Sequence, residues 1–243
     1  MTRAMRQWWN EVAGHRGRWQ ASRELLRVLL EFLRDSTPER RRQRYGDADY
    51  DWDFRVNTTS GTVGWRDRLL GSFHSAYQPT EPAAFHAMLA ELQQQTYLDF
   101  REFFFLDLGS GKGRTLLMAA DYPFRRIAGV ELLPALHQIA LENIANYHSD
   151  SQRCFAIESV CADATTYAFP PEPTILYLFN PFPVAALRRV LTNLEQSLRM
   201  HPRQVYVLYH NPLLADVFEE FPAMRRIGGS HHYAMYSAGV RPE

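Results

Sequence analysis

The stretch that most constrains the fold of this chain runs from Phe103 to Gly113 and reads FFFLDLGSGKG. It begins with a short apolar run interrupted only by Asp107, which is typical of a strand buried in a parallel sheet. Three glycines then alternate with other residues, and good helix formers follow from Arg114 to Ala120. A strand, a glycine turn and a helix in this order bring bare backbone N–H groups and a helix N-terminus close to a ligand.

The glycine spacing excludes two phosphate-binding motifs. A dinucleotide fingerprint, G-x-G-x-x-G, would require glycine in place of Arg114 or Leu116. A P-loop needs Ser or Thr after its Gly-Lys pair, whereas Gly113 follows Gly111-Lys112. The pattern that remains is D-x-G-x-G-x-G, with an acidic residue at the strand end. An ordinary βα turn is the plain alternative, and three alternating glycines directly after a buried strand disfavour it.

The rest of the chain alternates between short apolar runs and helical patterns. Further strands are predicted at 126–131, 155–161, 174–179 and 204–209, and helices at 83–95, 134–148 and 183–200. A helical connection at 212–218 leads to two short runs, 224–227 and 232–236, which predict a terminal antiparallel pair. The sequence therefore predicts an α/β fold, a doubly wound and mostly parallel seven-stranded sheet.

The D-x-G-x-G-x-G turn and this order of elements resemble the class I (seven-β-strand) S-adenosylmethionine (SAM) dependent methyltransferases over about residues 82–238. The resemblance implies a Rossmann-like SAM-binding methyltransferase domain at 81–243, an N-terminal helical and loop extension at 1–80, and SAM as the cofactor. It also implies that no phosphate has to be held, because the glycines let the backbone approach the methionine part and the ribose.

The resemblance assigns cofactor-binding roles to particular residues. Asp107 corresponds to the acid that orders the loop and the methionine amino group. Glu131 ends the second strand, where a carboxylate accepts hydrogen bonds from a ribose diol. Asp163 corresponds to the acceptor for the adenine amino group, and Ala164 to the backbone N–H donor for the ring. Glu131 as a surface residue and Asp163 as a helix cap are the alternatives. The remaining cofactor-binding candidates are Thr80, Gly109, Ser110, Gly111 and Gly113.

Residues 1–80 differ from the rest of the chain. Leucines between 25 and 33 recur at helical spacing, and residues 1–44 hold 11 arginines against 5 acidic residues. We expect amphipathic helical material packed on the main domain with a solvated arginine face, in preference to nucleic-acid or membrane contact. Residues 45–80 are polar, glycine-rich and irregular, and the aspartates at 47–53 indicate a surface loop in preference to a calcium site. The extension is expected to cover the acceptor side of the site.

Composition indicates a soluble, cytoplasmic protein. Apolar residues make up 46% of the chain and the formal net charge is zero. The apolar run near residue 30 is too short to span a bilayer, so no transmembrane segment is expected. Cys154 and Cys161 are expected to be buried, reduced thiols. No metal site is expected, since the adjacent His231 and His232 would point to opposite faces of a strand.

Two patterns favour an amine acceptor, with a protein lysine first. Tyr77, Pro79 and Thr80 precede the glycine turn by about 30 residues, which resembles the layout of the non-SET protein lysine methyltransferases. Thr80 is also expected to N-cap the helix that follows. Asn180-Pro181-Phe182 stands where amino-methylating enzymes carry their catalytic turn, and its third residue disfavours a nucleic-acid base as acceptor. The candidate catalytic residues are Tyr77, Asn180, Pro181 and Phe182.

Other functions remain open at this stage. The main alternative is a small-molecule methyltransferase, and a binding module that keeps the fold without the chemistry is another. Aminopropyl transfer would need an acidic pair in place of Asn180-Pro181, which the chain does not supply. A hydroxyl acceptor needs a base, and no histidine or carboxylate adjoins Asn180 in the sequence, which further favours nitrogen.

Overall fold

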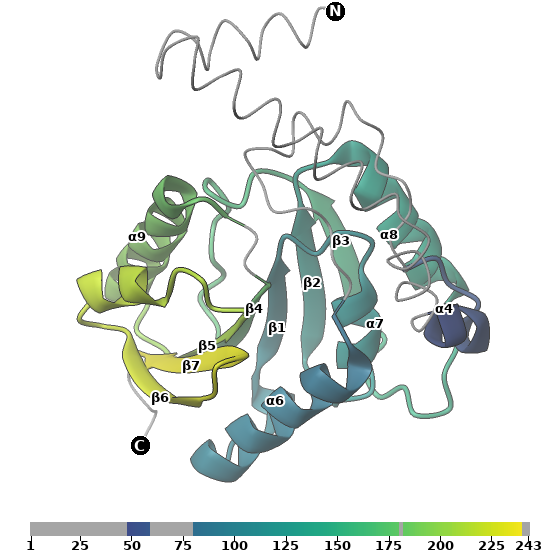
Figure 1. Ribbon diagram of the computed structural model, residues 1–243, viewed down its shortest axis with the longest axis horizontal. Helices are drawn as coiled ribbons and strands as arrows, with labels where there is room; N and C mark the ends of the chain where they lie inside the picture. Colours follow the sequence, from purple (N-terminus) through teal and green to yellow (C-terminus); the bar gives the residue numbers. More distant parts are fainter. Residues whose placement is uncertain (1–47, 59–79, 180–181, 240–243) are drawn as a thin grey trace, which may run out of the picture.

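A seven-stranded sheet forms the centre of the computed structural model, which describes residues 48–58, 80–179 and 182–239 (Figure 1). The strand order is β3-β2-β1-β4-β5-β7-β6. The first five strands pair in parallel, and β7 lies antiparallel to both β5 and β6. The strands are β1 (Phe104–Leu108), β2 (Arg126–Glu131), β3 (Ile157–Cys161), β4 (Thr174–Phe179), β5 (Val205–His210), β6 (Arg225–Gly229) and β7 (Tyr233–Ala238).

Helices cover both faces of the sheet, which gives three layers. Helix α6 (Pro82–Thr96) precedes β1 in the chain. Helix α7 (Arg114–Ala119) connects β1 to β2, and α8 (Pro134–Asn146) connects β2 to β3. Helix α9 (Val184–Met200) packs on the opposite face together with the 3-10 helix Ala215–Glu220. A second 3-10 helix, Phe100–Glu102, precedes β1, and the short helix α4 (Ala48–Phe54) lies beside α8 in Figure 1.

The central strands are buried on both faces, which explains their unbroken apolar sequences. All five residues of β1 are buried, and they alternate between two apolar clusters. Phe105 packs in the cluster with Leu89 of α6 and Leu117 of α7. Phe104 and Leu106 pack in the other cluster, which contains the apolar face of α9.

The strand order and the antiparallel β7 are those of the class I methyltransferase fold, so the predicted fold class is confirmed. Every predicted strand is present, with ends that match the prediction or differ from it by one or two residues, and β5 extends to His210. The predicted helices at 83–95, 134–148 and 183–200 are also present, while the connection at 212–218 is a 3-10 helix. The predictions for residues 1–44 concern residues outside the described ranges.

Several local predictions were wrong. Residues 45–80 were expected to be irregular, yet Ala48–Phe54 form a helix. Thr80 does not cap α6, because the N-cap residue is Glu81 and no side chain caps it. Cys154 is buried as expected, but Cys161 is exposed. His231 and His232 lie in the turn between β6 and β7, with their ring centroids 3.8 Å apart.

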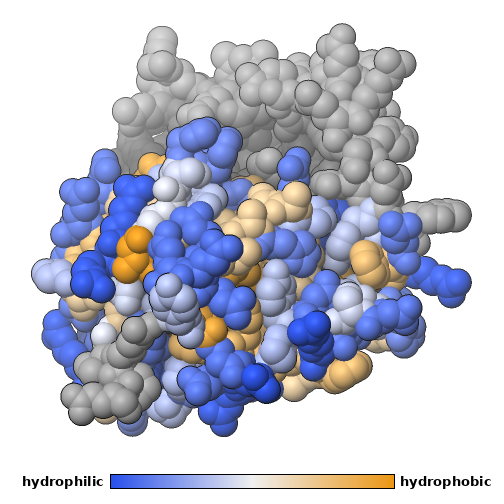
Figure 2. Space-filling model, turned by 90° about the horizontal axis from the view of Figure 1, so that it is seen from below, coloured by the Kyte–Doolittle hydropathy of each residue, from blue (hydrophilic) through white to orange (hydrophobic). Residues whose placement is uncertain are grey.

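The surface seen from below is largely hydrophilic, and its apolar side chains are scattered among polar ones (Figure 2). Within the described ranges, no helix combines the length and hydropathy that a bilayer crossing requires. The same part of the chain holds no cluster of three or more His, Cys, Asp or Glu side chains arranged to bind a metal ion.

Candidate cofactor site at the carboxyl edge of the sheet

The loop between β1 and α7 is built on three glycines in the left-handed backbone region. Gly109, Gly111 and Gly113 have φ values of 88°, 56° and 83°. Residues with a Cβ rarely adopt this conformation, so glycine is needed at each position for the loop to follow this path. Two hydrogen bonds from the N–H groups of Gly109 and Ser110 to the carbonyl of Val130, at 2.8 and 3.2 Å, fasten the loop to β2.

Asp107 is buried at the end of β1, beneath this loop. The hydroxyl of Thr115, in the first turn of α7, donates to its carboxylate oxygen Oδ2. Burial raises the pKa of Asp107 to about 7, the nearby Glu131 adds to this rise, and the bond from Thr115 opposes it. A buried acid whose charge is costly is well suited to a cationic ligand, which lowers that cost on binding.

Glu131 ends β2, and its buried carboxylate faces the loop. The N–H of Gly111 donates to Oε2 and the N–H of Leu133 donates to Oε1, both at 2.8 Å. Burial raises the pKa of Glu131, and these backbone donors oppose the rise. The chain itself thus holds the carboxylate in place, and each oxygen keeps further acceptor capacity for a hydroxyl donor.

Asp163 and Ala164 follow β3 at the same edge. The side chain of Asp163 is exposed, and its Oδ1 accepts from the N–H of Thr165 at 2.8 Å, so it caps the turn after the strand. Ala164 is buried in the apolar cluster on the α9 face. The capping role is observed, and the proposed adenine contact of these two residues stays a prediction.

Ser110 packs against β2 at Gly129, a residue that sequence reasoning missed. A Cβ built on Gly129 would lie 2.5 Å from the Ser110 hydroxyl oxygen and 2.6 Å from its Cβ. The glycine loop can lie on β2 only because Gly129 has no side chain. The Ser110 hydroxyl is buried and has no hydrogen-bond partner among the residues that the structure describes. A glycine inside a predicted strand was the available signal.

The segment containing α4 is clamped onto the start of α7, a contact that the sequence did not reveal. Buried Arg114 pairs with Asp51 at 3.5 Å, donates from Nε to the Thr58 hydroxyl at 2.7 Å, and lies 4.9 Å above the ring of Tyr50. Asp51 also accepts from the N–H of Thr58 at 2.9 Å. A buried guanidinium with a carboxylate, a hydroxyl and an aromatic face is held in one geometry.

Asn143 of α8 joins the same segment to the glycine loop. Its Nδ2 donates to the carbonyl of Lys112 at 2.9 Å and to that of Asn57 at 3.0 Å, while its Oδ1 accepts from the N–H of Asn57 at 2.7 Å. Lys112, the only lysine of the chain, donates from Nζ to Asn57 Oδ1 at 2.9 Å. Residues 48–58 therefore contact the glycine loop, whereas the extension was expected to cover the acceptor side; the predictions for 59–79 concern residues outside the described ranges.

Thr80 and the end of β4 form a second polar group at the carboxyl edge. The Thr80 hydroxyl lies 2.9 Å from the Tyr177 hydroxyl, which in turn lies 2.8 Å from Nδ1 of His210 at the end of β5. The imidazole of His210 stacks on Phe179, with centroids 4.2 Å apart and an angle of 11° between the planes. Tyr177 and His210 were not singled out in the sequence.

Three of the candidate catalytic residues, Tyr77, Asn180 and Pro181, lie outside the described residues. Phe182 is partly buried and packs against the apolar cluster on the α9 face. Its observed contacts are those of a packing residue, and a catalytic role for it stays a prediction.

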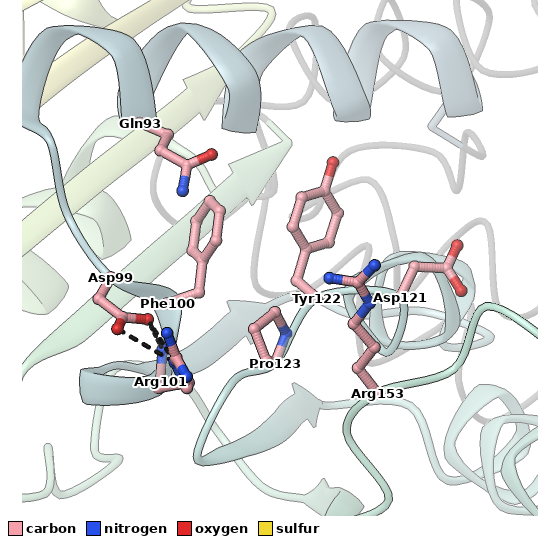
Figure 3. A pocket seen from close by; sticks show the side chains of 8 residues that line it. All are labelled: Gln93, Asp99, Phe100, Arg101, Asp121, Tyr122, Pro123 and Arg153. Atoms are coloured by element: carbon pink, nitrogen blue, oxygen red, sulfur yellow. Dashed lines mark hydrogen bonds and ion pairs between the residues drawn. The ribbon is translucent and has the colours of Figure 1, made fainter.

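A cavity of about 540 Å³ lies at the opposite edge of the sheet (Figure 3). Its lining residues precede β1, β2 and β3 in the chain or project from α6: Gln93, Asp99, Phe100, Arg101, Asp121, Tyr122, Pro123 and Arg153. The glycine loop follows β1 and so lies at the carboxyl ends of the strands, where ligands of open α/β sheets bind. This cavity lies at the other ends and is therefore separate from the glycine loop site.

Comparisons with known proteins add structures of similar fold. No family model matches the chain, and no curated protein matches it either. A Salinibacter ruber RNA methyltransferase solved with S-adenosyl-L-homocysteine is 19% identical, with a TM-score of 0.41, covering 68% of this chain and 95% of that one. The 23S rRNA methyltransferase ErmE is 16% identical, with a TM-score of 0.44, covering 68% of this chain and 70% of that one.

A Pyrococcus horikoshii OT3 protein is 12% identical, with a TM-score of 0.49, covering 71% of this chain and 96% of that one. Similarity at these identities and TM-scores does not show an activity or a ligand for this chain. The fold assignment rests on the strand order of this chain's own sheet.

The functional candidates form a row along the carboxyl edge of that sheet. Following the strand order, Asp163 comes after β3, Glu131 ends β2, the glycine loop follows β1, Phe179 ends β4 and His210 ends β5. The described residues of this row offer the exposed carboxylate of Asp163, the buried carboxylate of Glu131 and bare backbone on one side, and aromatic and imidazole groups on the other. Such an edge can hold an extended polar ligand beside a second reactant.

Proposed function

We propose that this protein is a SAM-dependent methyltransferase. The observation that carries the proposal is the glycine loop, with three left-handed glycines held between buried Asp107 and a Glu131 carboxylate fixed by the N–H of Gly111. No phosphate-binding fingerprint is present in the loop, so the ligand that it supports best is one with a nucleoside and a cationic amino-acid part.

The described residues fit SAM as the cofactor. Glu131 has acceptor capacity for a ribose diol, and Asp107 has a charge whose burial cost a cationic ligand would lower. The buried Ser110 hydroxyl of the loop lacks a partner among the described residues, and an ordered water would supply one. When bound, SAM supplies an electrophilic methyl group, and the protein has to bind it, exclude water and align a nucleophile.

The acceptor that we propose first is an amine, with a protein lysine favoured. The support is the sequence pattern around Tyr77, Pro79 and Thr80 and the Asn180-Pro181-Phe182 turn after β4. A small-molecule acceptor is the alternative, and an inactive SAM-binding module would bind the cofactor without transfer. The expectation that nucleic acid is not the acceptor finds no support in the described residues, so nucleic acid belongs among the outcomes to be measured.

Isothermal titration with SAM and with S-adenosylhomocysteine tests the cofactor. We expect micromolar binding of at least one of them, and an absence of binding to both would refute the proposal. Glu131→Ala should weaken binding by roughly 1.5–3 kcal/mol through the loss of charge-assisted hydrogen bonds. Glu142→Ala is the matched control, because Glu142 is an exposed residue on α8 whose Oε1 accepts a hydrogen bond from Gln138 at 3.4 Å.

The acceptor is tested by incubating the full-length protein with a cell lysate and methyl-labelled SAM. The class of molecule that takes up the radiolabel is then determined. Label recovered in protein as methyl-lysine supports the amine proposal. Label in nucleic acid or in small molecules identifies another acceptor class, and SAM binding without any transfer identifies the binding module.

A further inference from the structure

His210 is held at the end of β5 by a hydrogen-bonded chain that runs from Thr80, which precedes α6, through Tyr177 of β4. The Thr80 hydroxyl lies 2.9 Å from the Tyr177 hydroxyl, and the Tyr177 hydroxyl lies 2.8 Å from His210 Nδ1. Thr80 and Tyr177 are buried, and His210 is half-buried. The stack on Phe179 fixes the plane of the imidazole, so both its position and its rotation are set.

The second ring nitrogen of His210, Nε2, makes no hydrogen bond within the described part of the chain. In a neutral ring whose Nδ1 carries the proton, Nε2 is a hydrogen-bond acceptor. A ring that is fixed on one side and has one nitrogen left over is arranged for a ligand or for water.

The pairing of the strands puts this group on the acceptor side of the proposed cofactor. Asp107 pairs with Tyr177, and Phe179 pairs with His210, so all four lie on one face of β1, β4 and β5 near their carboxyl ends. Two strand spacings separate β1 from β5, which is about 10 Å. With Asp163, Glu131 and the glycine loop aligned over β3, β2 and β1, a second reactant has to approach over β4 and β5.

We propose that His210 binds the methyl acceptor, with Nε2 accepting a hydrogen bond from an N–H of a neutral primary or secondary amine. Tyr177 and Thr80 are then positioning residues that hold the imidazole. This inference rests on the proposed methyltransferase function and specifies the substrate side of that site. It does not depend on the residues between Phe179 and Phe182.

The transfer step balances without a base. The amine nitrogen forms the N–CH₃ bond with its lone pair, the S–CH₃ bond breaks, and its electron pair remains on sulfur as a neutral thioether. The positive charge moves from sulfur to nitrogen, and every N–H proton stays on the nitrogen. An acceptor for one N–H bond therefore orients the lone pair without removing a proton.

The role requires a particular tautomer of His210. In this tautomer Nδ1–H donates to the oxygen of Tyr177, the Tyr177 O–H donates to the oxygen of Thr80, and Nε2 is unprotonated. Burial raises the pKa of Tyr177 well above its usual value, so the phenol keeps the proton that it donates.

A neutral imidazole suits a site that handles a positive charge. Burial, together with the smaller effect of nearby His232, lowers the pKa of His210 to about 4. Other groups facing His210 are the Tyr177 hydroxyl on β4 and Tyr233, its pairing partner on β7, whose hydroxyl donates to Glu91 of α6. A base this weak is poorly matched to a hydroxyl acceptor, which must lose its proton, but it accepts a hydrogen bond from an amine.

The tautomer is tested first, because this measurement needs no acceptor. Long-range ¹H–¹⁵N correlation spectra of the full chain with S-adenosylhomocysteine, assigned by the signals lost in His210→Gln, report the protonation of each ring nitrogen. We expect a neutral ring protonated on Nδ1 from pH 6 to pH 8. A ring protonated on Nε2, or a charged imidazolium in this range, overturns the proposal.

Two replacements of His210 then separate acceptor binding from packing. His210→Gln places an amide oxygen near the position of Nε2, whereas His210→Asn places its polar group near Nδ1 and leaves the Nε2 position empty. We expect His210→Asn to lower the rate of label transfer from SAM to protein about 10²-fold, and His210→Gln to restore most of that rate. Both should bind S-adenosylhomocysteine as the wild type does.

Tyr177→Phe tests the positioning chain, with Tyr206→Phe as the matched removal of a hydroxyl from another buried tyrosine in the same apolar cluster. Tyr177→Phe should slow transfer and change the ring tautomer, and Tyr206→Phe should do neither. The inference is overturned, while the methyltransferase function stands, if His210→Asn transfers label at the wild-type rate. A product methylated on oxygen or carbon overturns it in the same way. A wild type that binds neither SAM nor S-adenosylhomocysteine instead refutes the proposed function.

Discussion

The contact between Gly129 and Ser110 makes the sharpest prediction, because one methyl group on β2 should lift the whole glycine loop. In Gly129→Ala the new Cβ would lie 2.6 Å from Ser110 Cβ and 2.8 Å from Leu116 Cδ1. Non-bonded carbon atoms pack at about 3.5–4.0 Å, so the loop has to move by about 1 Å. Ser110 is short, its N–H is tied to the carbonyl of Val130, and it cannot swing aside.

Overpacking of this kind costs about 1–3 kcal/mol of unfolding free energy. We expect urea unfolding to show a loss of this size for Gly129→Ala. Titration with S-adenosylhomocysteine should show at least about tenfold weaker binding, which corresponds to about 1.4 kcal/mol, because the displaced loop no longer presents the N–H of Gly111 beside Glu131.

Gly228→Ala is the matched control in an outer strand. Its Cβ would meet the amide end of Gln95 and the terminal methyl of Met235, each at 2.7 Å, and both are the far ends of flexible side chains. We expect a change within about 0.5 kcal/mol. Adding Ser110→Gly to Gly129→Ala should recover most of the stability, and adding Ser110→Ala should recover less, since its Cβ remains. A Gly129→Ala variant as stable and as tightly binding as the Gly228→Ala variant would show that the loop does not rest on β2.

The remaining predictions concern the loop, the clamp and the buried acid. Gly111→Ala forces a Cβ into a backbone with φ of 56°, at about 1–2 kcal/mol, and should abolish cofactor binding in a folded protein; titration that finds unchanged affinity contradicts this. Asp51→Asn should lower the unfolding free energy by about 1–3 kcal/mol because buried Arg114 loses its charged partner, whereas the exposed neighbour Asp53→Asn should change it by less than about 0.5. Asp107, whose pKa of about 7 lies above its ordinary value of 3.8, stabilises the fold most below about pH 4, and this contribution is lost as the pH rises towards 7. Unfolding of Asp107→Asn between pH 4 and 8 should therefore show a flatter loss of stability than the wild type, and parallel curves would contradict the assignment.

The sequence by itself predicted the seven strands, the three long helices and the position of the glycine loop. Continuous apolar runs such as Phe104–Leu108 are local patterns, and the requirement for left-handed glycines at Gly109, Gly111 and Gly113 is a property of the backbone at those positions. The alternation of strands and helices then limits the sheet to few topologies. These predictions needed no knowledge of which distant residues meet.

Only the tertiary structure decided the contacts between segments far apart in the chain. Threonine is a residue type that often caps helices. The Thr80 hydroxyl instead bonds to Tyr177, 97 residues away, in the hydrogen-bonded chain that holds His210. No histidine adjoins Asn180 in the sequence, but the pairing of β4 with β5 brings His210 onto Phe179, the residue before it. Likewise, Arg114 contacts Asp51 and Thr58, which lie more than 50 residues earlier in the chain. A buried guanidinium requires polar partners, and the local sequence does not identify them.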